Sequence, residues 1–340
     1  MNRLIESRFD GFMDIESIRQ RVTVRPEPIV DLEAFHPLVA AELLSGRLKE
    51  MYLPNEFSLN FIQEMIGLAN LHSLKVFSSE KAYAQGLFSP PEVEVTPICL
   101  TGLAGVGKSQ TIAALRRAMP PPVELTCDVF GGSIELTSLW YASARGKAGG
   151  RQLLMDFVYG SDHDGRGGNS AKLLIQCRRH ANRDGVSLVV LDETQHINTG
   201  SGASKVTDIL LTMTAIGPPM IFVSNYSLVH KLLRRNSEDK QRLLSEPRVM
   251  LPEDPKSQNW AEYVDECNHI EKSFRLTLEA TEHVTSNAMI MHESLEYLQM
   301  SQSFYAEFHK GLYLAERHFA GQVKTMAAQS TQLKNLIDSL

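Results

Sequence analysis

The sequence has few cysteines, no long hydrophobic run and no excess of positive charge. Its 340 residues include 4 cysteines, 34 Lys and Arg against 40 Asp and Glu, and a formal net charge of −6. That charge excludes a protein that coats nucleic acid by bulk positive charge, so any such contact must come from a local patch. No apolar run approaches the roughly 20 residues that cross a bilayer, and the N-terminus lacks the apolar core of a signal peptide. We expect a cytoplasmic protein without membrane contact.

The cysteines form no recognisable framework. Cys99, Cys127, Cys177 and Cys267 lie far apart, without a Cys-x-x-Cys pair. Cys177 and His180 are close, but no second pair completes a zinc site or a disulfide. We predict reduced thiols that fill the interior as small apolar side chains.

From Thr96 onward, short apolar runs alternate with helical spacing. This alternation predicts an α/β fold, with a parallel sheet and crossover helices. The clearest strands are predicted at 98–100, 187–191 and 220–223, and weaker ones at 123–126 and 248–251. Helices are predicted at 110–119, 173–183 and 228–235.

The flanks of this region differ from it in pattern. Residues 1–95 are predicted to form an N-terminal extension, broken early by Pro26, Pro28 and Pro37, with helical spacing at Val39, Leu43, Leu44, Phe61, Ile62, Met65 and Ile66. Residues 96–252 are predicted to be the core. Residues 253–340 have helical spacing, as at Phe304, Phe308, Leu312 and Ala315, and contain 13 Asp and Glu against 7 Lys and Arg. This helical part suits protein docking better than DNA binding.

The strongest motif follows the first predicted strand. It matches G-x-x-x-x-G-K-[ST] in full and lies between a predicted strand and a predicted helix, as a phosphate-binding loop requires. Its glycines let backbone N–H groups surround phosphates, while Lys108 would reach the β and γ phosphates and Ser109 would ligate Mg²⁺. The predicted nucleotide contacts are Gly102, Leu103, Ala104, Gly105, Val106, Gly107, Lys108, Ser109 and Gln110.

A second motif ends the strand at 187–191. Asp192 and Glu193 follow the apolar run in a Walker B pattern. Asp192 would hold Mg²⁺ through water, and Glu193 would orient and polarise an attacking water. The alternative is a solvated strand end.

Further site residues are predicted downstream. Asn225 ends the third strand, where it would hydrogen-bond the attacking water as sensor 1; alternatively it opens a turn or caps the next helix. An arginine from a neighbouring subunit would complete the site. Its candidates are Arg234, Arg235, Arg242 and Arg248, of which Arg242 is preferred because it shortly precedes the strand at 248–251. A plain surface arginine is the alternative.

Basic residues gather between Ser143 and Arg183. Arg145, Lys147 and Arg151 lie in a glycine-rich stretch that predicts a loop, and 162–169 is a second such stretch. Loops of this kind could follow a phosphate backbone without reading bases. Flexible charged loops without a partner are the alternative.

With these motifs the chain resembles the TnsC/TniB family of AAA+ regulators of DNA transposition, including the versions in CRISPR-associated transposons. The resemblance covers roughly residues 96–320. It rests on Gly-Leu-Ala-Gly-Val-Gly-Lys-Ser, Leu-Asp-Glu-Thr-Gln-His-Ile at 191–197, Ser224-Asn225, and the segment from Arg242 to Pro252. The extension before residue 95 is longer than in minimal members.

The resemblance implies an AAA+ P-loop NTPase with a helical C-terminal lid, using ATP and Mg²⁺. Members of that family assemble on double-stranded DNA as rings or helical filaments when ATP is bound. They link a target-selection protein to the transposase subunits, and hydrolysis resets the assembly. ATP would lie between subunits, with Arg242 supplied by the neighbour. The candidate for sensor 2 is Arg317.

Two other readings of the motifs stay open. One is a different DNA-associated AAA+ ATPase, such as a loader or remodeller. The other is a P-loop kinase that acts on a small molecule. Glu193 beside Asp192 and the position of Arg242 favour water as the nucleophile and a subunit interface over the kinase.

Overall fold

The computed structural model describes residues 7–30, 34–91, 95–127, 132–147, 149–160, 168–197, 203–245, 247–254 and 256–270. These residues form two compact units. The first is drawn from Met1–Arg21, Glu56–Gly102 and Lys108–Met250, and the second from Val22–Asn55, Leu103–Gly107 and Leu251–Leu340. Residues 1–95, predicted as one extension, thus contribute to both units.

A five-stranded parallel sheet with the order β4-β5-β6-β1-β7 is the centre of the first unit. Strands β1 and β5 are buried along their whole length, as expected for apolar runs in a sheet covered on both faces. The predicted parallel sheet is confirmed. Its strands are β1 (Ile98–Gly102), β4 (Leu139–Ser143), β5 (Leu188–Asp192), β6 (Met220–Asn225) and β7 (Pro247–Met250).

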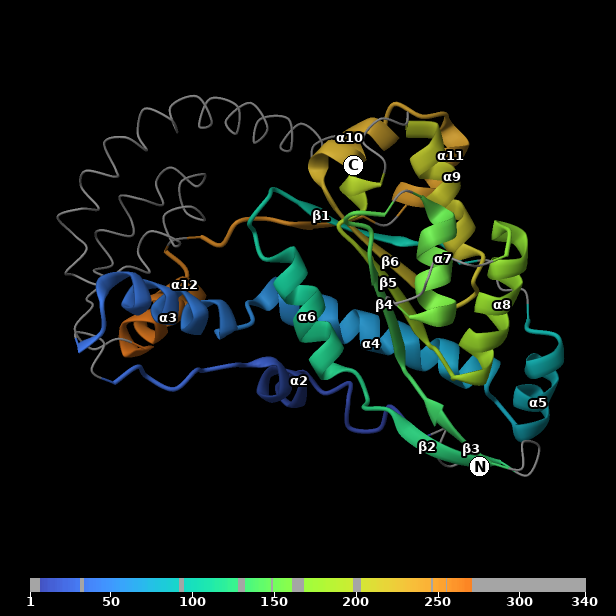
Figure 1. Cartoon of the computed structure of the whole chain (residues 1–340), viewed down its shortest axis with the longest axis horizontal. Coiled ribbons are helices and arrows are strands. Elements are labelled where there is room, and N and C mark those ends of the chain that lie inside the picture. Colours follow the sequence, from blue (N-terminus) through green and yellow to red (C-terminus); the bar gives the residue numbers. More distant parts are fainter. Residues whose placement is uncertain are drawn as a thin grey trace. The chain divides into compact units, whose positions relative to one another are not determined.

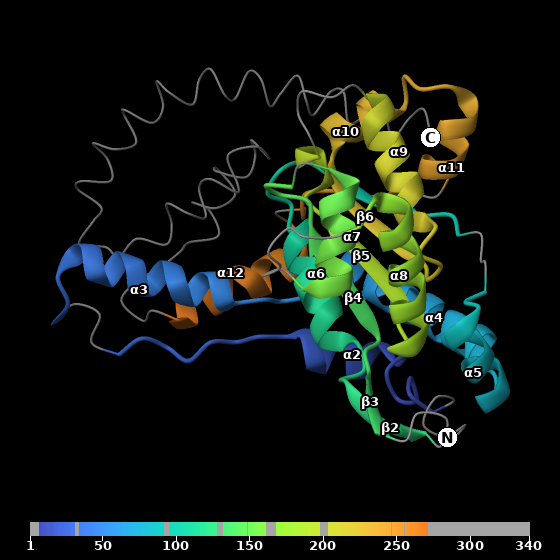
Figure 2. The same ribbon diagram turned by 45° about the vertical axis from the view of Figure 1, so that its right-hand side comes forward.

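Helices cover both faces of this sheet (Figures 1 and 2). On one face lie α4 (Glu56–Val76) and α6 (Lys108–Ala118), which pack against each other. On the other lie α7 (Gly150–Tyr159), α8 (Ser170–Arg183) and α9 (Ala203–Thr214). The first unit also contains α5 (Glu80–Phe88), α10 (Tyr226–Leu232) and α11 (Ser237–Leu244), and most of α2 (Ile15–Val22).

The predicted strand at 123–126 forms outside the parallel sheet. It is β2 (Val123–Cys127), which pairs antiparallel with β3 (Gly132–Leu136). Leu125 and Leu136 pack with Phe77 and Tyr83 in a small buried cluster. The fifth strand of the main sheet is β4, which the sequence analysis did not identify.

Helical spacing in the N-terminal region corresponds to two helices in different units. In the first unit, α4 buries Phe61, Ile62, Met65 and Ile66, as its spacing predicts. In the second unit, α3 (Pro37–Glu50) begins at Pro37, which was predicted to break structure. Proline is tolerated in the first helical turn, because the N–H that it lacks would have no partner within the helix.

The second unit has its own core. Helix α3 packs against α12 (Gln258–Ile270) through Leu44, Leu48, Trp260 and Val264. Arg25 forms ion pairs with Glu262 and Glu266 of α12. Helix α12 is the described part of the predicted helical C-terminal region. The apolar positions predicted at Phe304, Phe308, Leu312 and Ala315 lie outside the described residues.

Three of the cysteines have described side chains. Cys99, Cys177 and Cys267 are buried free thiols, as predicted. Burial raises the pKa of each to about 12, so they stay protonated and act as small apolar groups. No helix among the described residues is long and apolar enough to cross a membrane.

Candidate nucleotide-binding site

The predicted phosphate-binding loop connects β1 to α6. Gly102 ends β1, residues 103–107 form the turn, and Lys108 begins the helix. Gly105 and Gly107 have φ angles of 85° and 98°. In that left-handed region a side chain would be strained, so the turn requires glycine at both positions. Ser109 and Gln110 are exposed in the first turn of α6, where backbone N–H groups lack helical partners and can bind an anion.

Lys108 is held as a buried cation. Only 8% of it is exposed, and its Nζ donates a hydrogen bond to the Gly102 carbonyl oxygen at 3.1 Å. Desolvation lowers the pKa of Lys108 from 10.5 to about 8, opposed by the charges of Glu193 and Asp192. The ammonium group therefore stays protonated at neutral pH, at a cost that a bound anion would relieve.

Asp192 ends β5 beside the first turn of α6. Ser109 Oγ lies 3.5 Å from Asp192 Oδ1, and Tyr141 donates a hydrogen bond to Oδ2 at 3.4 Å. The guanidinium of Arg116 stacks over the Tyr141 ring at 4.5 Å. Burial raises the pKa of Asp192, opposed first by the hydrogen bond from the Glu193 N–H. A hydroxyl and a carboxylate at this distance suit Mg²⁺, which prefers oxygen ligands.

Glu193 has a left-handed backbone conformation. Its φ of 57° and ψ of 33° make it the only described residue other than glycine with a positive φ. Such residues are uncommon and cluster at functional sites. Glu193 precedes the short 3-10 helix η2 (Thr194–His196). Its Oε2 accepts a hydrogen bond from Gln195 Nε2 and lies 3.2 Å from His196 Nε2.

Asn225 ends β6, beside Gly102 of β1 in the sheet register. It is the N-cap residue of α10, as the alternative has it, but its side chain makes no capping hydrogen bond. Its backbone N–H donates to Gln195 Oε1 at 3.3 Å. Because β1, β5 and β6 are parallel neighbours, Gly102, Asp192 and Asn225 meet at the same edge of the sheet.

Two residues at this edge were given no role by the sequence analysis. Gln195 lies inside the motif at 191–197, and only its contacts with Glu193 and Asn225 reveal what it joins. Tyr141 belongs to β4, which contains two adjacent aromatic residues. Because aromatic residues are enriched in strands, this pair could have indicated the strand from the sequence. Its neighbour Trp140 stacks on Phe157 at 5.3 Å.

The four candidate arginines differ in their surroundings. Arg248 is bound to Glu64 through two nitrogens, and Arg235 forms an ion pair with Asp239 at 2.9 Å. Arg234 and Arg242 are exposed. The Arg242 side chain on α11 is 51% exposed and lies 3.9 Å from Glu238. Exposure at a surface is what a residue needs if it is to reach a neighbouring subunit. Arg317, the candidate for sensor 2, lies outside the described residues.

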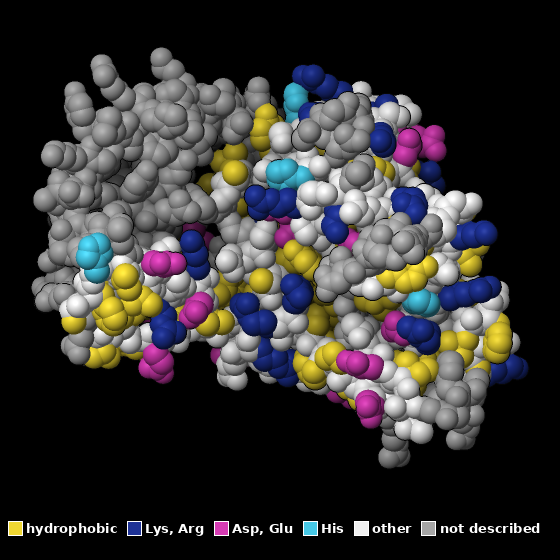
Figure 3. All heavy atoms as spheres, in the orientation of Figure 1, with side chains coloured by type: hydrophobic (Ala, Val, Ile, Leu, Met, Phe, Trp, Pro, Cys, Tyr) yellow, Lys and Arg dark blue, Asp and Glu magenta, His cyan; other side chains and the backbone are white. Residues whose placement is uncertain are grey.

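The three residues predicted to contact DNA differ in their exposure and in their partners. Arg145 is exposed in a loop, but Lys147 pairs with Asp156 at 2.9 Å. Arg151 lies in the first turn of α7, so the predicted loop does not extend to it, and its Nε donates to the Gly168 carbonyl oxygen. On the face seen in Figure 3, described Lys and Arg side chains occur in separate groups among acidic and apolar ones. DNA contact stays a prediction.

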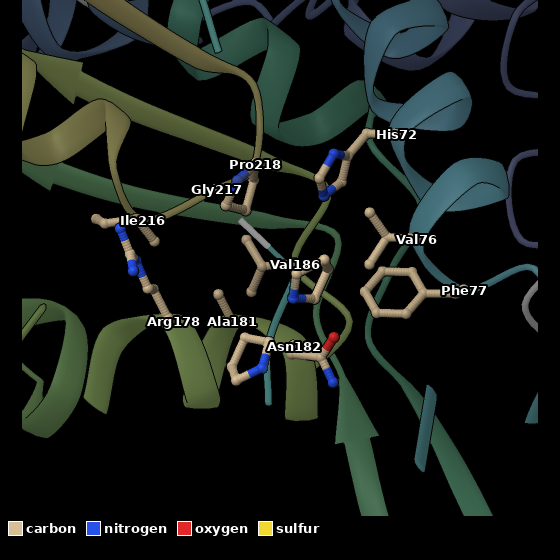
Figure 4. A pocket seen from close by; sticks show the side chains of 12 residues that line it. His72, Val76, Phe77, Arg178, Ala181, Asn182, Val186, Ile216, Gly217 and Pro218 are labelled. Carbon is tan, nitrogen blue, oxygen red and sulfur yellow. The ribbon is translucent and has the colours of Figure 1, made fainter. Parts of the chain in front are cut away.

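A pocket lies at the opposite end of the strands from Asp192 and Asn225 (Figure 4). Its walls include Val186 just before β5 and Gly217 and Pro218 just before β6. His72 points into it from α4, and burial lowers the pKa of His72 to about 4, so the ring is neutral. The pocket is separate from the candidate nucleotide site.

Residues 95–232 match the family model described as an AAA domain. No curated protein matches the chain significantly. Among solved structures, the chain is similar to the Aeropyrum pernix ORC1 protein in complex with DNA, with 15% identity, 55% of this chain and 48% of that chain covered, and a TM-score of 0.38. It is also similar to Cdc6p from Pyrobaculum aerophilum, with 13% identity, 64% of this chain and 51% of that chain covered, and a TM-score of 0.41. A third similar structure is PCH-2 from C. elegans, with 14% identity, 55% of this chain and 44% of that chain covered, and a TM-score of 0.28.

The chain spans about half of the length of each of these structures. At such identities and scores, the likeness says nothing of what this chain binds. The AAA domain match, together with the five-stranded parallel sheet and its flanking helices, confirms the AAA+ P-loop fold predicted from the sequence.

Proposed function

We propose that the protein is an ATP-hydrolysing regulator of DNA transposition. It assembles on double-stranded DNA as a ring or helical filament with ATP bound, and links a target-selection protein to the transposase subunits. Hydrolysis resets the assembly. The observation that carries the ATPase part is the meeting of Lys108, Ser109, Asp192, Glu193 and Asn225 around the carboxyl ends of β1, β5 and β6.

Nucleotide binding uses the positive end of this site. Lys108 holds the β and γ phosphate oxygens, and the N–H groups of residues 102–110 surround the phosphates. Ser109 would ligate Mg²⁺ and Asp192 would hold it through water; Ser109 Oγ and Asp192 Oδ1 lie 3.5 Å apart, and oxygen is the donor that Mg²⁺ prefers. When bound, the metal ion neutralises charge on the phosphates.

Hydrolysis uses the acidic end. Glu193 orients a water molecule and polarises it toward the γ phosphorus, and Asn225 hydrogen-bonds the same water. The water oxygen bonds to the γ phosphorus as the bond from that phosphorus to the β–γ bridging oxygen breaks, and the proton that the water loses goes to the Glu193 carboxylate, which leaves ADP and phosphate. A kinase would need a substrate hydroxyl where Glu193 holds water.

Subunits must assemble if an arginine from a neighbouring subunit is needed to complete each hydrolysis site. Arg242 reaches the γ phosphate bound by the neighbouring subunit, and its 51% exposed side chain is placed at a surface. A site completed by a neighbour makes hydrolysis depend on assembly. This dependence would let the protein act as a switch.

DNA binding and the transposition role rest on the resemblance in the motif at 191–197 and in the segment from Arg242 to Pro252. Arg145 is the best placed of the predicted DNA contacts, because its side chain is exposed in a loop. Backbone contact without base reading fits a basic loop that offers no recognition helix.

The test is electron microscopy of the purified protein with duplex DNA, with and without a slowly hydrolysed ATP analogue. Phosphate release is measured in parallel on the same protein preparation with ATP and Mg²⁺, with and without duplex DNA. We expect rings or filaments only with nucleotide and DNA, and DNA-stimulated phosphate release. Lys108→Ala serves as the control, because it should abolish nucleotide binding and assembly together.

Dispersed particles in every sample, with phosphate release intact, would reject the assembly on DNA and leave an ATPase of another kind. ATP consumption without free phosphate, seen only after small molecules with an acceptor hydroxyl are added, would favour the small-molecule kinase. Normal ATP binding by Lys108→Ala would refute the phosphate-binding loop itself.

A further inference from the structure

The side chain of Gln195 connects two predicted catalytic residues. Its Nε2 donates a hydrogen bond to Glu193 Oε2 at 2.5 Å, and its Oε1 accepts one from the Asn225 N–H at 3.3 Å. One amide group therefore joins the residue after β5 to the last residue of β6. Because its NH₂ group donates one hydrogen bond and its oxygen accepts the other, the orientation of the amide is fixed.

The segment that carries Gln195 is anchored to β6 by a second contact. Thr194 is fully buried, and its Oγ1 donates to the Val223 carbonyl oxygen at 2.8 Å. Ile197, directly after η2, is also buried. The short helix is thus fastened to the carboxyl end of β6 by one contact on either side of Ser224. A displacement of that strand end would move Gln195 with it.

Glu193 is directed toward this bridge by its backbone. It stands at the position before η2 in the left-handed conformation, where a polar side chain often caps a helix. Its carboxylate makes no capping hydrogen bond. Instead, Oε2 meets Gln195 and His196. The carboxylate is therefore used for contacts with these two side chains and not for holding the turn.

We infer that Gln195 is a positioning residue for hydrolysis: it sets the orientation of the Glu193 carboxylate and ties that orientation to the end of β6. This inference rests on the proposed ATPase function. With Oε2 held by the amide, the rotation of the carboxylate is fixed, and so is the direction in which Oε1 faces the attacking water. A change at Asn225 on nucleotide binding is passed to Glu193 through a single side chain.

Two substitutions distinguish the hydrogen bond of Gln195 to Glu193 from its hydrogen bond to Asn225. Gln195→Met keeps the length and removes both hydrogen bonds. Gln195→Glu keeps an acceptor for the Asn225 N–H, but it loses the donor and places a like charge beside Glu193. Gln176→Met is the matched control, because Gln176 is a similarly half-buried glutamine in α8, bonded to Tyr159.

The measurements are kcat and KM for phosphate release with duplex DNA, the affinity for a fluorescent ATP analogue, and the unfolding midpoint. We expect Gln195→Met to lower kcat by about 10-fold to 100-fold, with KM and nucleotide affinity within about 2-fold of wild type. Gln195→Glu should lower kcat at least as far. Gln176→Met should match wild type in every measurement.

Three results would overturn the inference. Wild-type kcat in Gln195→Met is the first. A parallel fall of kcat, nucleotide affinity and unfolding midpoint is the second, because it indicates a structural role only. Normal kcat in Gln195→Glu is the third, because the contact with Glu193 would then be dispensable.

The variant Glu193→Gln is assayed in the same experiment. It distinguishes failure of the inference on Gln195 from failure of the proposed function. If Glu193→Gln is slow and Gln195→Met is normal, only the inference on Gln195 falls. If both hydrolyse ATP at the wild-type rate, Glu193 has no part in hydrolysis and the inference on Gln195 falls, while the ATPase activity stands. If wild type does not hydrolyse ATP, the proposed function falls.

Discussion

Ser109 Oγ lies 3.5 Å from Asp192 Oδ1, although 83 residues separate them in the chain. The contact joins the first turn of α6 to the end of β5, and so joins the two motifs that the sequence analysis treated separately. Both atoms are oxygens at the edge of a parallel sheet, so they are the kind of donors that Mg²⁺ prefers.

Removing the Ser109 hydroxyl or the negative charge of Asp192 should weaken the response to Mg²⁺. We expect Ser109→Ala and Asp192→Asn to bind ATP without Mg²⁺ nearly as wild type does, and to lose most of the gain in affinity that Mg²⁺ gives, by about 10-fold or more. The measurement is nucleotide affinity across a Mg²⁺ titration, with Ser237→Ala on α11 as control. An unchanged Mg²⁺ response in both variants would remove the pair from the metal site.

Nucleotide affinity should fall at alkaline pH. Burial lowers the pKa of Lys108 to about 8, so in the free protein the side chain loses its charge as the pH rises above 8. A bound phosphate favours the charged form, so binding above this pH must take up a proton. We expect affinity to be flat below about pH 7.5 and to fall toward 10-fold per pH unit above about 8.5.

Calorimetry in buffers of different ionisation enthalpy would measure this proton uptake. Lys108→Arg supplies the control, because arginine stays charged throughout. If its curve and the wild-type curve fall together, the pH dependence belongs to another group.

The sheet was largely predictable, because its strands have strong signals. The runs ending at Gly102, Asp192 and Asn225 are apolar, buried and bounded by polar residues, and the motifs at their ends depend on local spacing alone. Strand β4 was missed because its residues are only half-buried, and Tyr141 was missed with it. Strand β2 was found, but its antiparallel partner could not be inferred from spacing.

The role that we propose for Gln195 depends on a contact between segments 30 residues apart. Nothing in the sequence indicates that the amide spans from Glu193 to Asn225. The left-handed backbone of Glu193 was equally hidden, because the conformation is rare for a residue that is not glycine. Local pattern therefore located the candidate catalytic acids but not the contacts that Glu193 makes.

Replacing each of two helical glycines with alanine should change the free energy of unfolding in opposite directions. A Cβ at Gly86 in α5 would lie 2.3 Å from Asn182 Oδ1, and Asn182 is buried and hydrogen-bonded to the Tyr83 carbonyl oxygen. We expect Gly86→Ala to lower the free energy of unfolding by about 1–3 kcal/mol. Gly67 in α4 has open space, so Gly67→Ala should raise it by about 0.5–1 kcal/mol.

Denaturant unfolding of both variants tests this pair. Stabilisation of the protein by Gly86→Ala would mean that Asn182 can move at little cost, and that α5 and α8 are not closely fitted there.

Arg242 should act on the nucleotide of a neighbouring subunit. Arg242→Ala alone should bind ATP and hydrolyse it about 10³-fold or more slowly, because a cation that stabilises the transition state is lost. Lys108→Ala subunits cannot bind ATP but still carry Arg242. A 1:1 mixture should therefore recover up to about a quarter of wild-type phosphate release, since about that share of interfaces pairs an intact loop with an intact arginine.

Arg234→Ala is the control for this experiment, because Arg234 is also exposed and was the other accessible candidate. The mixture is also imaged on DNA with nucleotide, to check that Lys108→Ala subunits, which should not assemble alone, enter assemblies with Arg242→Ala subunits. If they do and phosphate release does not recover while Arg242→Ala is slow, Arg242 acts within its own subunit. If Arg234→Ala is the slow variant and its mixture recovers, the arginine finger belongs to the turn after α10 and not to α11. In that case the subunit interface would be formed by a different part of the surface.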